Sequence, residues 1–428
     1  MREQQATTET LLDAARRADG ALYTAPMVAI LAAGSTFGFS SSVFNLLPKY
    51  LVEVLGAGPA QIGMVTATFG AATVAVCPLL ARWIDRMPRG HFVRLGALLM
   101  IVTSLAFSYV DEFDVLLIVL RAVQGAAFGL TFTALTTLVA DVAPAKRLSE
   151  ALGLVGASML ITNAIAPAVV EPLAAGYGWT PAFVLAAVLA GASLVIGGFL
   201  DAHPHARDRG GVPMDAAEPR TSGRTLHYAI ITASVGCAFG VMFTYHQPFA
   251  LSLGRANVSG FFVSYCVAAL VARLALGRLT DRIGRFRVAV VALHLYTLVV
   301  LATAAMQPGL LEAYGALLGL SHGMFFPAFN ALAIAGASPS GRGRLLTVFT
   351  AAFYGGFAAG VLVLGALAEH GGYPIVFAAT AATTFTASGL LVFSRAFLVE
   401  AQPTSTGHPI EVVSVGPVDE TCASKGAT

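Results

Sequence analysis

Charged side chains are scarce in this 428-residue chain: Asp, Glu, Lys and Arg make up 11% of it, against 57% apolar residues. An ordinary soluble domain is about 25% charged, so most of this surface must face something other than water. The formal net charge is only +2, and no basic block of the kind that binds nucleic acid is present. The composition therefore excludes a typical soluble domain and a nucleic-acid partner.

Cysteine is also rare, and its spacing excludes two further classes of site. The four cysteines fall singly, in three apolar stretches and near the C-terminus, which suggests neither a disulfide framework nor a zinc site. No His-Glu-x-x-His metal motif occurs, and no lysine follows a glycine as a phosphate loop requires. We therefore expect no metal, no cofactor and no enzymatic activity.

Apolar segments long enough to cross a bilayer are abundant. A helical span needs about 20 apolar residues, and lipid admits little besides helices and closed barrels. Twelve such segments, numbered helix 1 to helix 12 in this section, are predicted at 25–51, 59–82, 92–110, 114–139, 149–174, 181–200, 227–252, 258–279, 286–306, 309–334, 345–368 and 374–396. The sequence predicts an all-α membrane protein with twelve transmembrane helices in two pseudo-symmetric six-helix bundles.

The predicted organisation is a cytoplasmic segment 1–24, a bundle 25–200, a cytoplasmic linker 201–226, a bundle 227–396 and a disordered cytoplasmic tail 397–428. Basic residues fix the orientation because they collect on the cytoplasmic side. With the N-terminus inside, Lys49 and Arg255 face outward and Arg121 lies within a span, which leaves 22 of the 25 Lys and Arg residues inside. The first 24 residues do not resemble a cleaved signal. We expect a multi-pass protein of the cell (inner) membrane with both termini cytoplasmic.

The two halves carry the same landmarks in the same order, with offsets of 194 to 202 residues. The matched pairs are Gly34-x-x-Phe37-Gly38 with Gly236-x-x-Phe239-Gly240, Asp85-Arg86 with Asp281-Arg282, Gln124-Gly125 with His322-Gly323, Pro144 and Arg147 with Pro339 and Arg342, and Gly178-Trp179 with Gly372-Tyr373. This agreement favours duplication over chance. Parallel repeats of six helices, with a binding site between them near the midplane, are one architecture of secondary transporters.

The two Asp-Arg turns resemble the signature Gly-x-Leu-x-Asp-Arg-x-Gly-Arg-(Arg/Lys) of the major facilitator superfamily. The copy at Gly277–Arg287 fits closely, whereas the first copy has Ala81 for the leading glycine and Pro88-Arg89-Gly90 for Gly-Arg-Arg. Helix 4 carries Arg121-x-x-Gln124-Gly125, which is similar to the superfamily's Arg-x-x-Gln-Gly element. The resemblance covers residues 25–396, and helix 10 is also similar to that of bacterial sugar or drug efflux permeases.

The resemblance implies a cytoplasmic gate made of Asp85, Arg86, Arg89, Asp141, Asp281, Arg282 and Arg285. In it, Asp85 would approach the start of helix 11 near Thr347, where unpaired N–H groups attract an anion. Asp281 would face the start of helix 5 near Ser149, and Arg89 would pair with Asp141. The alternative is simple positive-inside anchoring, which explains the arginines but not two matched aspartates.

A charge inside the membrane is costly and functional by default, and we expect Arg121 to be the only basic residue deep in a span. Histidine can carry a proton near neutral pH, although either histidine could merely bond a neighbouring helix. Asn45 and Gln247 occupy equivalent repeat positions, and buried amides need partners. The predicted substrate and proton pathway comprises Asn45, Arg121, Gln124, Glu171, Tyr245, His246, Gln247, His322 and Asn330.

The sequence favours a secondary active transporter of a small organic solute that works by alternating access as a monomer in the lipid bilayer. Similarity in helix 10 favours efflux driven by a proton gradient. The alternative is proton-coupled uptake of a small organic anion or zwitterion, since helix 5 keeps only Pro167 of the glycine-rich run typical of proton-antiporting drug exporters. A membrane enzyme would need a catalytic constellation that is absent from the sequence, and a receptor would need an output domain.

Overall fold

The computed structural model describes residues 22–81, 87–144, 147–201, 223–334, 339–393 and 395. Ten helical stretches in these residues are long and apolar enough to cross a membrane. One of them, Leu345–Phe393, is two helices joined at Gly372, and α10 adds the shorter apolar stretch Ser259–Ala275. Counting these separately gives the twelve crossings predicted, and the helical membrane fold is confirmed.

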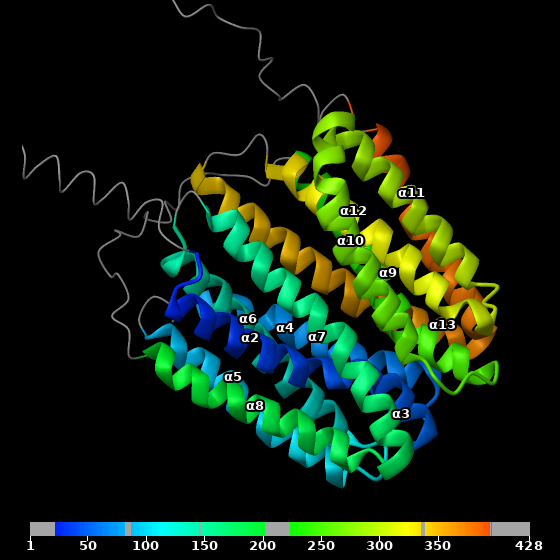
Figure 1. The fold of residues 1–428 in the computed structure, drawn as a ribbon. Coiled ribbons are helices and arrows are strands. Elements are labelled where there is room, and N and C mark those ends of the chain that lie inside the picture. Colours follow the sequence, from blue (N-terminus) through cyan, green and yellow to red (C-terminus); the bar gives the residue numbers. More distant parts are fainter. Residues whose placement is uncertain are drawn as a thin grey trace, which may run out of the picture.

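The first bundle packs α2 against α6, α7 and α8, and α5 against α6 and α8 (Figure 1). Its elements are α2 (Ala25–Val43), η1 (Phe44–Leu46), α3 (Leu47–Glu53), α4 (Pro59–Ala81), α5 (Arg89–Ala106), η2 (Phe107–Tyr109), α6 (Val115–Val142), α7 (Leu148–Tyr177) and α8 (Thr180–Asp201). The second bundle comprises α9 (Gly223–Ser252), α10 (Ser259–Ile283), α11 (Arg285–Thr303), η4 (Pro308–Leu310), α12 (Leu311–Ile334) and α13 (Pro339–Phe393).

Two boundaries differ from the predicted ones. The 3₁₀ turn η1 interrupts the first span, and α3 begins directly after it. Pro48 lies in the first turn of α3, where its missing N–H removes no intrahelical hydrogen bond. The second bundle begins earlier than predicted, because 223–226 of the predicted linker already belong to α9. The rest of that linker, the N-terminal segment up to residue 21 and the C-terminal tail lie outside the described residues.

The repeat seen in the sequence extends to backbone conformation. Gly178, between α7 and α8, has φ 79° and ψ 178°. Gly372, the equivalent residue inside α13, has φ 71° and ψ −178°. Glycine adopts positive φ without the Cβ penalty, so both halves turn between their last two helices in the same way.

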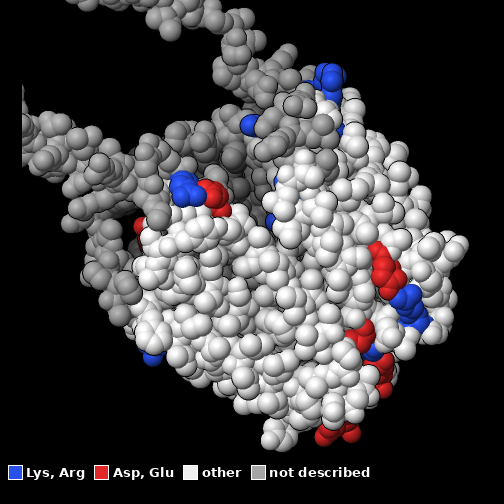
Figure 2. All heavy atoms as spheres, in the orientation of Figure 1, with Lys and Arg blue, Asp and Glu red and all other residues white. Residues whose placement is uncertain are grey.

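The surface of the bundles is apolar across its middle. Figure 2 shows a broad band nearly free of charged atoms, with acidic and basic groups gathered toward its two ends. Large apolar side chains such as Val115 (76% exposed), Leu274 (75%) and Phe199 (64%) point outward from the helices. Such exposure is unfavourable in water and expected in lipid, so the protein is a multi-pass membrane protein.

Candidate functional site between the two bundles

The bundles meet mainly at two helix pairs: α4 packs on α13, and α7 packs on α10. Glycines allow the first approach, because a Cβ on Gly63 would collide with the Val361 carbonyl of α13. A Cβ on Gly70 would likewise lie 2.9 Å from the ring of Phe357. Small residues let helices in lipid approach closely, so these positions set the contact between the bundles.

Tyr245 of α9 helps to hold this contact. Its side chain is fully buried, and its hydroxyl donates to the Val361 carbonyl. Pro59 at the start of α4 offers a second carbonyl at 3.4 Å. The predicted pathway residue Tyr245 thus ties α9, α4 and α13 together at the predicted outer end.

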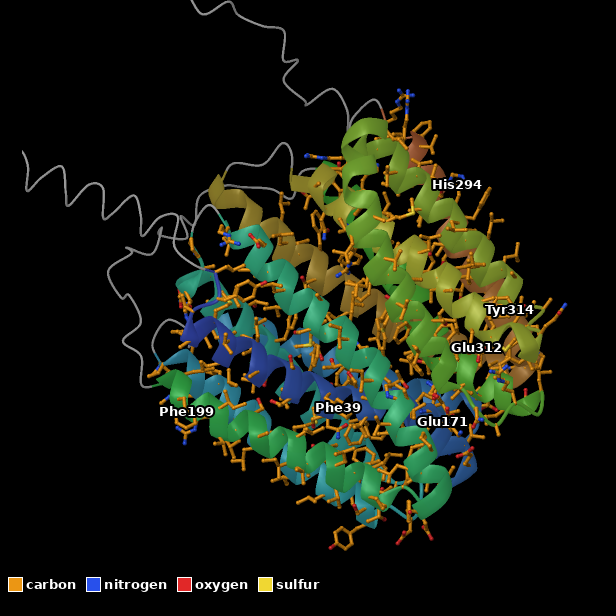
Figure 3. The ribbon with its side chains drawn as sticks, in the orientation of Figure 1. Phe39, Glu171, Phe199, His294, Glu312 and Tyr314 are labelled. Carbon is orange, nitrogen blue, oxygen red and sulfur yellow. The ribbon has the colours of Figure 1, made fainter. Side chains whose placement is uncertain are left out.

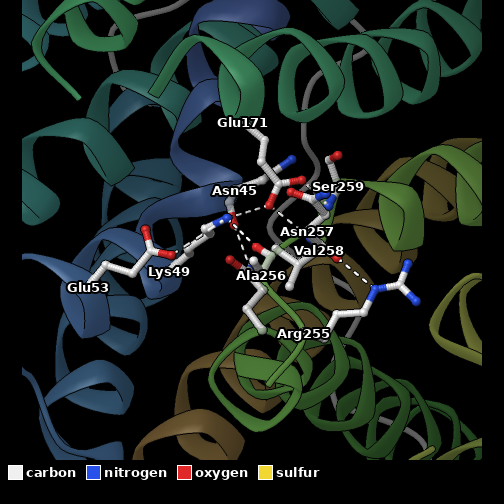
Figure 4. Close-up of polar contacts among 10 residues, drawn as sticks. Asn45, Lys49, Glu53, Glu171, Arg255, Ala256, Asn257, Val258 and Ser259 are labelled. Carbon is white, nitrogen blue, oxygen red and sulfur yellow. Dashed lines mark hydrogen bonds and ion pairs between the residues drawn. The ribbon is translucent and has the colours of Figure 1, made fainter. Parts of the chain in front are cut away.

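A buried ionic cluster occupies the α7–α10 contact at the same end (Figure 4). Lys49 Nζ of α3 lies 2.7 Å from Glu171 Oε1 of α7, and these residues are only 6% and 4% exposed. Lys49 also donates to the carbonyl of Ala256, in the turn before α10. Glu53, one helical turn along α3, approaches the same ammonium group at 3.7 Å.

The carboxylate of Glu171 reaches across to the second bundle as well. It accepts hydrogen bonds of 2.8 Å from the backbone N–H groups of Val258 and Ser259, at the start of α10. The first N–H groups of a helix lack intrahelical acceptors, and the helix dipole favours an anion there. Figure 3 places Glu171 where α7 meets α10, at the opposite end of the molecule from Phe199.

The α9–α10 turn is also anchored within its own bundle. Arg255 forms an ion pair with Glu312 and donates to the carbonyls of Asn257 (3.1 Å) and Pro308 (2.6 Å). The turn is therefore a fixed part of the second bundle. We name Lys49, Glu171 and the 256–259 backbone the outer latch, since their hydrogen bonds link the two bundles.

A row of amides lies one helical turn from the latch. Asn45 Nδ2 and Ser42 Oγ both donate to Asn163 Oδ1 of α7, at 2.8 and 2.9 Å. Gln247 Nε2 of α9 donates to the Asn45 carbonyl at 2.8 Å. The break at η1 leaves that carbonyl free for a partner outside its helix. The structure thus brings Asn45 and Gln247 together across the bundles.

Arg121 is buried in α6, with 6% exposure. Its Nη1 donates to Gln124 Oε1 at 2.7 Å, and its guanidinium lies 4.6 Å from the centre of the Phe69 ring. No described carboxylate pairs with it, and both Arg121 Nε and Gln124 Nε2 lack a hydrogen-bond partner among the described residues. The site therefore holds an uncompensated positive charge with spare donors.

The two predicted histidines lie in different surroundings. His246 is fully buried and stacks on Phe261 of α10 at 3.9 Å between ring centres, so it packs within the second bundle. His322 of α12 is 7% exposed among aromatic rings, and its Nδ1 has no partner among the described residues. Asn330 lies half-buried on α12, eight residues further along.

At the predicted inner end, Arg89 and Asp141 form an ion pair between α5 and α6, and Arg89 also contacts the Thr137 carbonyl at 3.3 Å. Arg285 begins α11 and is exposed. Asp85 and Arg86 lie outside the described residues, and the side chains of Asp281 and Arg282 are likewise not described. The predicted contacts of the two aspartates thus remain predictions.

Sequence reasoning missed two features of the site. It counted Lys49 as an outward-facing charge, whereas the structure buries it beside Glu171. It also counted Arg273 among the 22 cytoplasmic charges, whereas Arg273 lies inside α10, 14 residues after its first residue. Its position inside the predicted span 258–279 was the available signal. Within the described residues, no group of three or more His, Cys, Asp or Glu side chains could hold a metal.

Comparison with known proteins agrees with this architecture. The chain is 25% identical to the multi-drug resistance efflux pump PmrA of Streptococcus pneumoniae, over 79% of this chain and 88% of the pump. It is 27% identical to the multidrug resistance protein MdtG of Salmonella paratyphi A, over 80% and 88% of the two chains.

Solved structures show the same fold. The nucleoside transporter NupG superposes with a TM-score of 0.70 at 15% identity, covering 86% of this chain and 99% of its own. A bacterial homolog of the human lysosomal transporter Spinster gives 0.67 at 13% identity, covering 89% and 98%. The family profile of the Major Facilitator Superfamily matches residues 28–254 and 226–414. The chain is therefore a transporter rather than an enzyme, and it belongs to the Major Facilitator Superfamily.

Proposed function

We propose that this protein exports a small organic solute from the cell in exchange for protons, by alternating access between its two bundles. The outer latch carries the proposal: it joins the bundles through a buried charge pair bonded to the other bundle's backbone. Separating the partners of a buried pair leaves a charge without its partner, which is strongly unfavourable, so such a contact suits a gate that must hold one of two states. The names of the drug-efflux relatives support export.

In this proposal the outer latch closes the extracellular side, and the cytoplasmic gate closes the other. Arg89, paired with Asp141, positions the first Asp-Arg turn, and Asp85 and Asp281 bind helix starts when the inner side closes. Arg86, Arg282 and Arg285 hold the turns at the cytoplasmic membrane surface. Both termini lie in the cytoplasm and the monomer is the working unit. Cysteines placed at 85 and 281 should then react with a membrane-impermeant reagent only from the cytoplasmic side.

The solute would bind between the bundles near Arg121, Gln124, Asn45 and Gln247. Three buried titratable side chains are available to carry the proton: Glu171, His246 and His322. Replacement of the residue that carries the proton should abolish coupling of transport to the proton gradient. Exchange of solute for solute across the membrane should remain intact.

Everted membrane vesicles test the exchange. A proton pump acidifies their interior, and a pH-sensitive dye reports the gradient. Addition of a transported solute should dissipate the gradient in vesicles containing the protein and leave it unchanged in vesicles containing Arg121→Ala. Solute-driven proton entry into intact, right-side-out vesicles would instead show uptake by symport and would overturn the proposed direction.

A further inference from the structure

The second bundle contains a polar cluster that combines His322, one of the predicted pathway residues, with two residues outside that pathway. Arg273 lies on α10, Tyr296 on α11 and His322 on α12, and these three helices pack on one another (Figure 1). The rings of Tyr296 and His322 are 6.2 Å apart between centres. α10 and α12 are in close contact at this point, because a Cβ on Gly323, the residue after His322, would lie 2.9 Å from the Cβ of Ala272, the residue before Arg273.

All three side chains present hydrogen-bonding atoms without partners. Arg273 Nε, Tyr296 Oη and His322 Nδ1 are each buried and have no hydrogen-bond partner among the described residues. Tyr296 is fully buried and His322 is 7% exposed. Buried polar groups in folded proteins are nearly always paired, and leaving one unpaired is unfavourable. Three unpaired groups on three neighbouring helices indicate that a bound molecule supplies their hydrogen-bond partners.

The cluster faces the other bundle. The point where a Cβ on Gly156 of α7 would lie is 3.6 Å from Arg273 Nη1. Arg273 is only partly buried, whereas Tyr296 is fully buried, and it is the guanidinium of Arg273 that lies close to α7 of the other bundle. A solute between the bundles could therefore reach the guanidinium first and the neutral donors behind it.

The repeat relates this cluster to Arg121. His322 occupies the repeat position of Gln124, the residue that accepts a hydrogen bond from Arg121. Each half thus sets an arginine near the same repeat position, although the arginines come from different helices, α6 and α10. Neither guanidinium forms an ion pair with a described carboxylate. A buried charge without a counter-charge is costly in a membrane, so an anion is the expected ligand.

The aromatic rings around His322 indicate the chemical class of the rest of the ligand. Phe239, Tyr265 and Phe326 surround His322, with ring centres 5.2, 5.9 and 5.0 Å away. Such rings pack well on another flat, apolar ring. We propose that Arg273, His322 and Tyr296 bind the carboxylate of an aromatic organic acid, and that such acids are the solutes carried. This proposal rests on the transport function proposed above and names its substrate class.

Equilibrium binding to the purified full-length protein in nanodiscs tests the proposal without any gradient. The probes are naphthoate and its neutral amide, naphthamide, at neutral pH. We expect the wild type to bind naphthoate at least 10-fold more tightly than naphthamide. Arg273→Gln should lose that preference, while Arg273→Lys should keep part of it, because a bidentate contact becomes a single charge. His322→Phe should weaken naphthoate binding less than Arg273→Gln does.

Arg287→Gln is the matched control, since Arg287 is exposed on the first turn of α11, and it should bind both probes as the wild type does. Equal affinity of the wild type for acid and amide, or an equal loss of both in Arg273→Gln, would overturn the proposal. Equal affinity of the wild type for naphthoate and naphthamide is decisive even if no variant folds. Proton exchange with a different solute in everted vesicles, without naphthoate binding, would leave the transport function standing and reject the substrate class alone.

Discussion

Two of the ion pairs, one at each end of the protein, differ in what they join. At the predicted outer end, Lys49 and Glu171 are almost fully buried and bond to the backbone of the second bundle. At the predicted inner end, Arg89 and Asp141 connect α5 to α6 within the first bundle, and their side chains are 19% and 30% exposed. The outer pair can therefore control the distance between bundles, whereas the inner pair stabilises one of them.

Replacement of Glu171 should have the largest effect. Glu171→Gln removes the charge that holds Lys49 and leaves at most one side-chain oxygen for the two N–H groups of α10. Breaking a buried pair costs about 3–5 kcal/mol, which corresponds to a shift of about 100-fold or more toward the outward-open state.

The shift can be measured as the distance between spin labels on cysteines at Val54 and Leu310, both about half exposed and one in each bundle. The labels are introduced after replacement of the four native cysteines. A distance distribution unchanged from that of the parent would contradict a latch at Glu171.

Lys49→Met should shift the same distribution in the same direction, but less. The variant loses the ion pair and the bond to the Ala256 carbonyl. Glu171 still accepts from Val258 and Ser259, and the α10 dipole still favours its charge. A larger effect for Lys49→Met than for Glu171→Gln would show that the ammonium, and not the carboxylate, is the main link between the bundles.

The two ends also differ in how much of their structure could be predicted from the sequence. Helix number and the repeat were predictable because lipid requires long apolar helices and duplication leaves matched landmarks, such as Gly178 and Gly372. The pairing of Arg89 with Asp141 followed from a resemblance, and the structure brings them together. The relation of Lys49 to Glu171 was not predictable, since it links residues 122 positions apart.

For similar reasons, the sequence did not predict the contact between Asn45 and Gln247 or the cluster around Arg273. Repeat equivalence suggested that Asn45 and Gln247 matter, yet their contact runs through the Asn45 backbone carbonyl, which only the break at η1 makes available. Arg273 was counted among the cytoplasmic charges, although it lies within the predicted span 258–279. Its neighbours on α11 and α12 are distant in sequence, so only packing reveals the cluster they form.

The smallest effect is expected at the inner pair. Asp141→Asn removes a partly exposed ion pair within the first bundle, and such pairs contribute about 1 kcal/mol or less. We expect a small decrease in thermal stability of the purified protein and no change in the distance between labels at Val54 and Leu310. Glu150→Gln, in the exposed pair with Arg147 at the same end, serves as the control and should leave both measurements unchanged. A widened outer distance in Asp141→Asn would show that the two ends are coupled more tightly than their contacts indicate, because a change confined to the first bundle would then have released the latch.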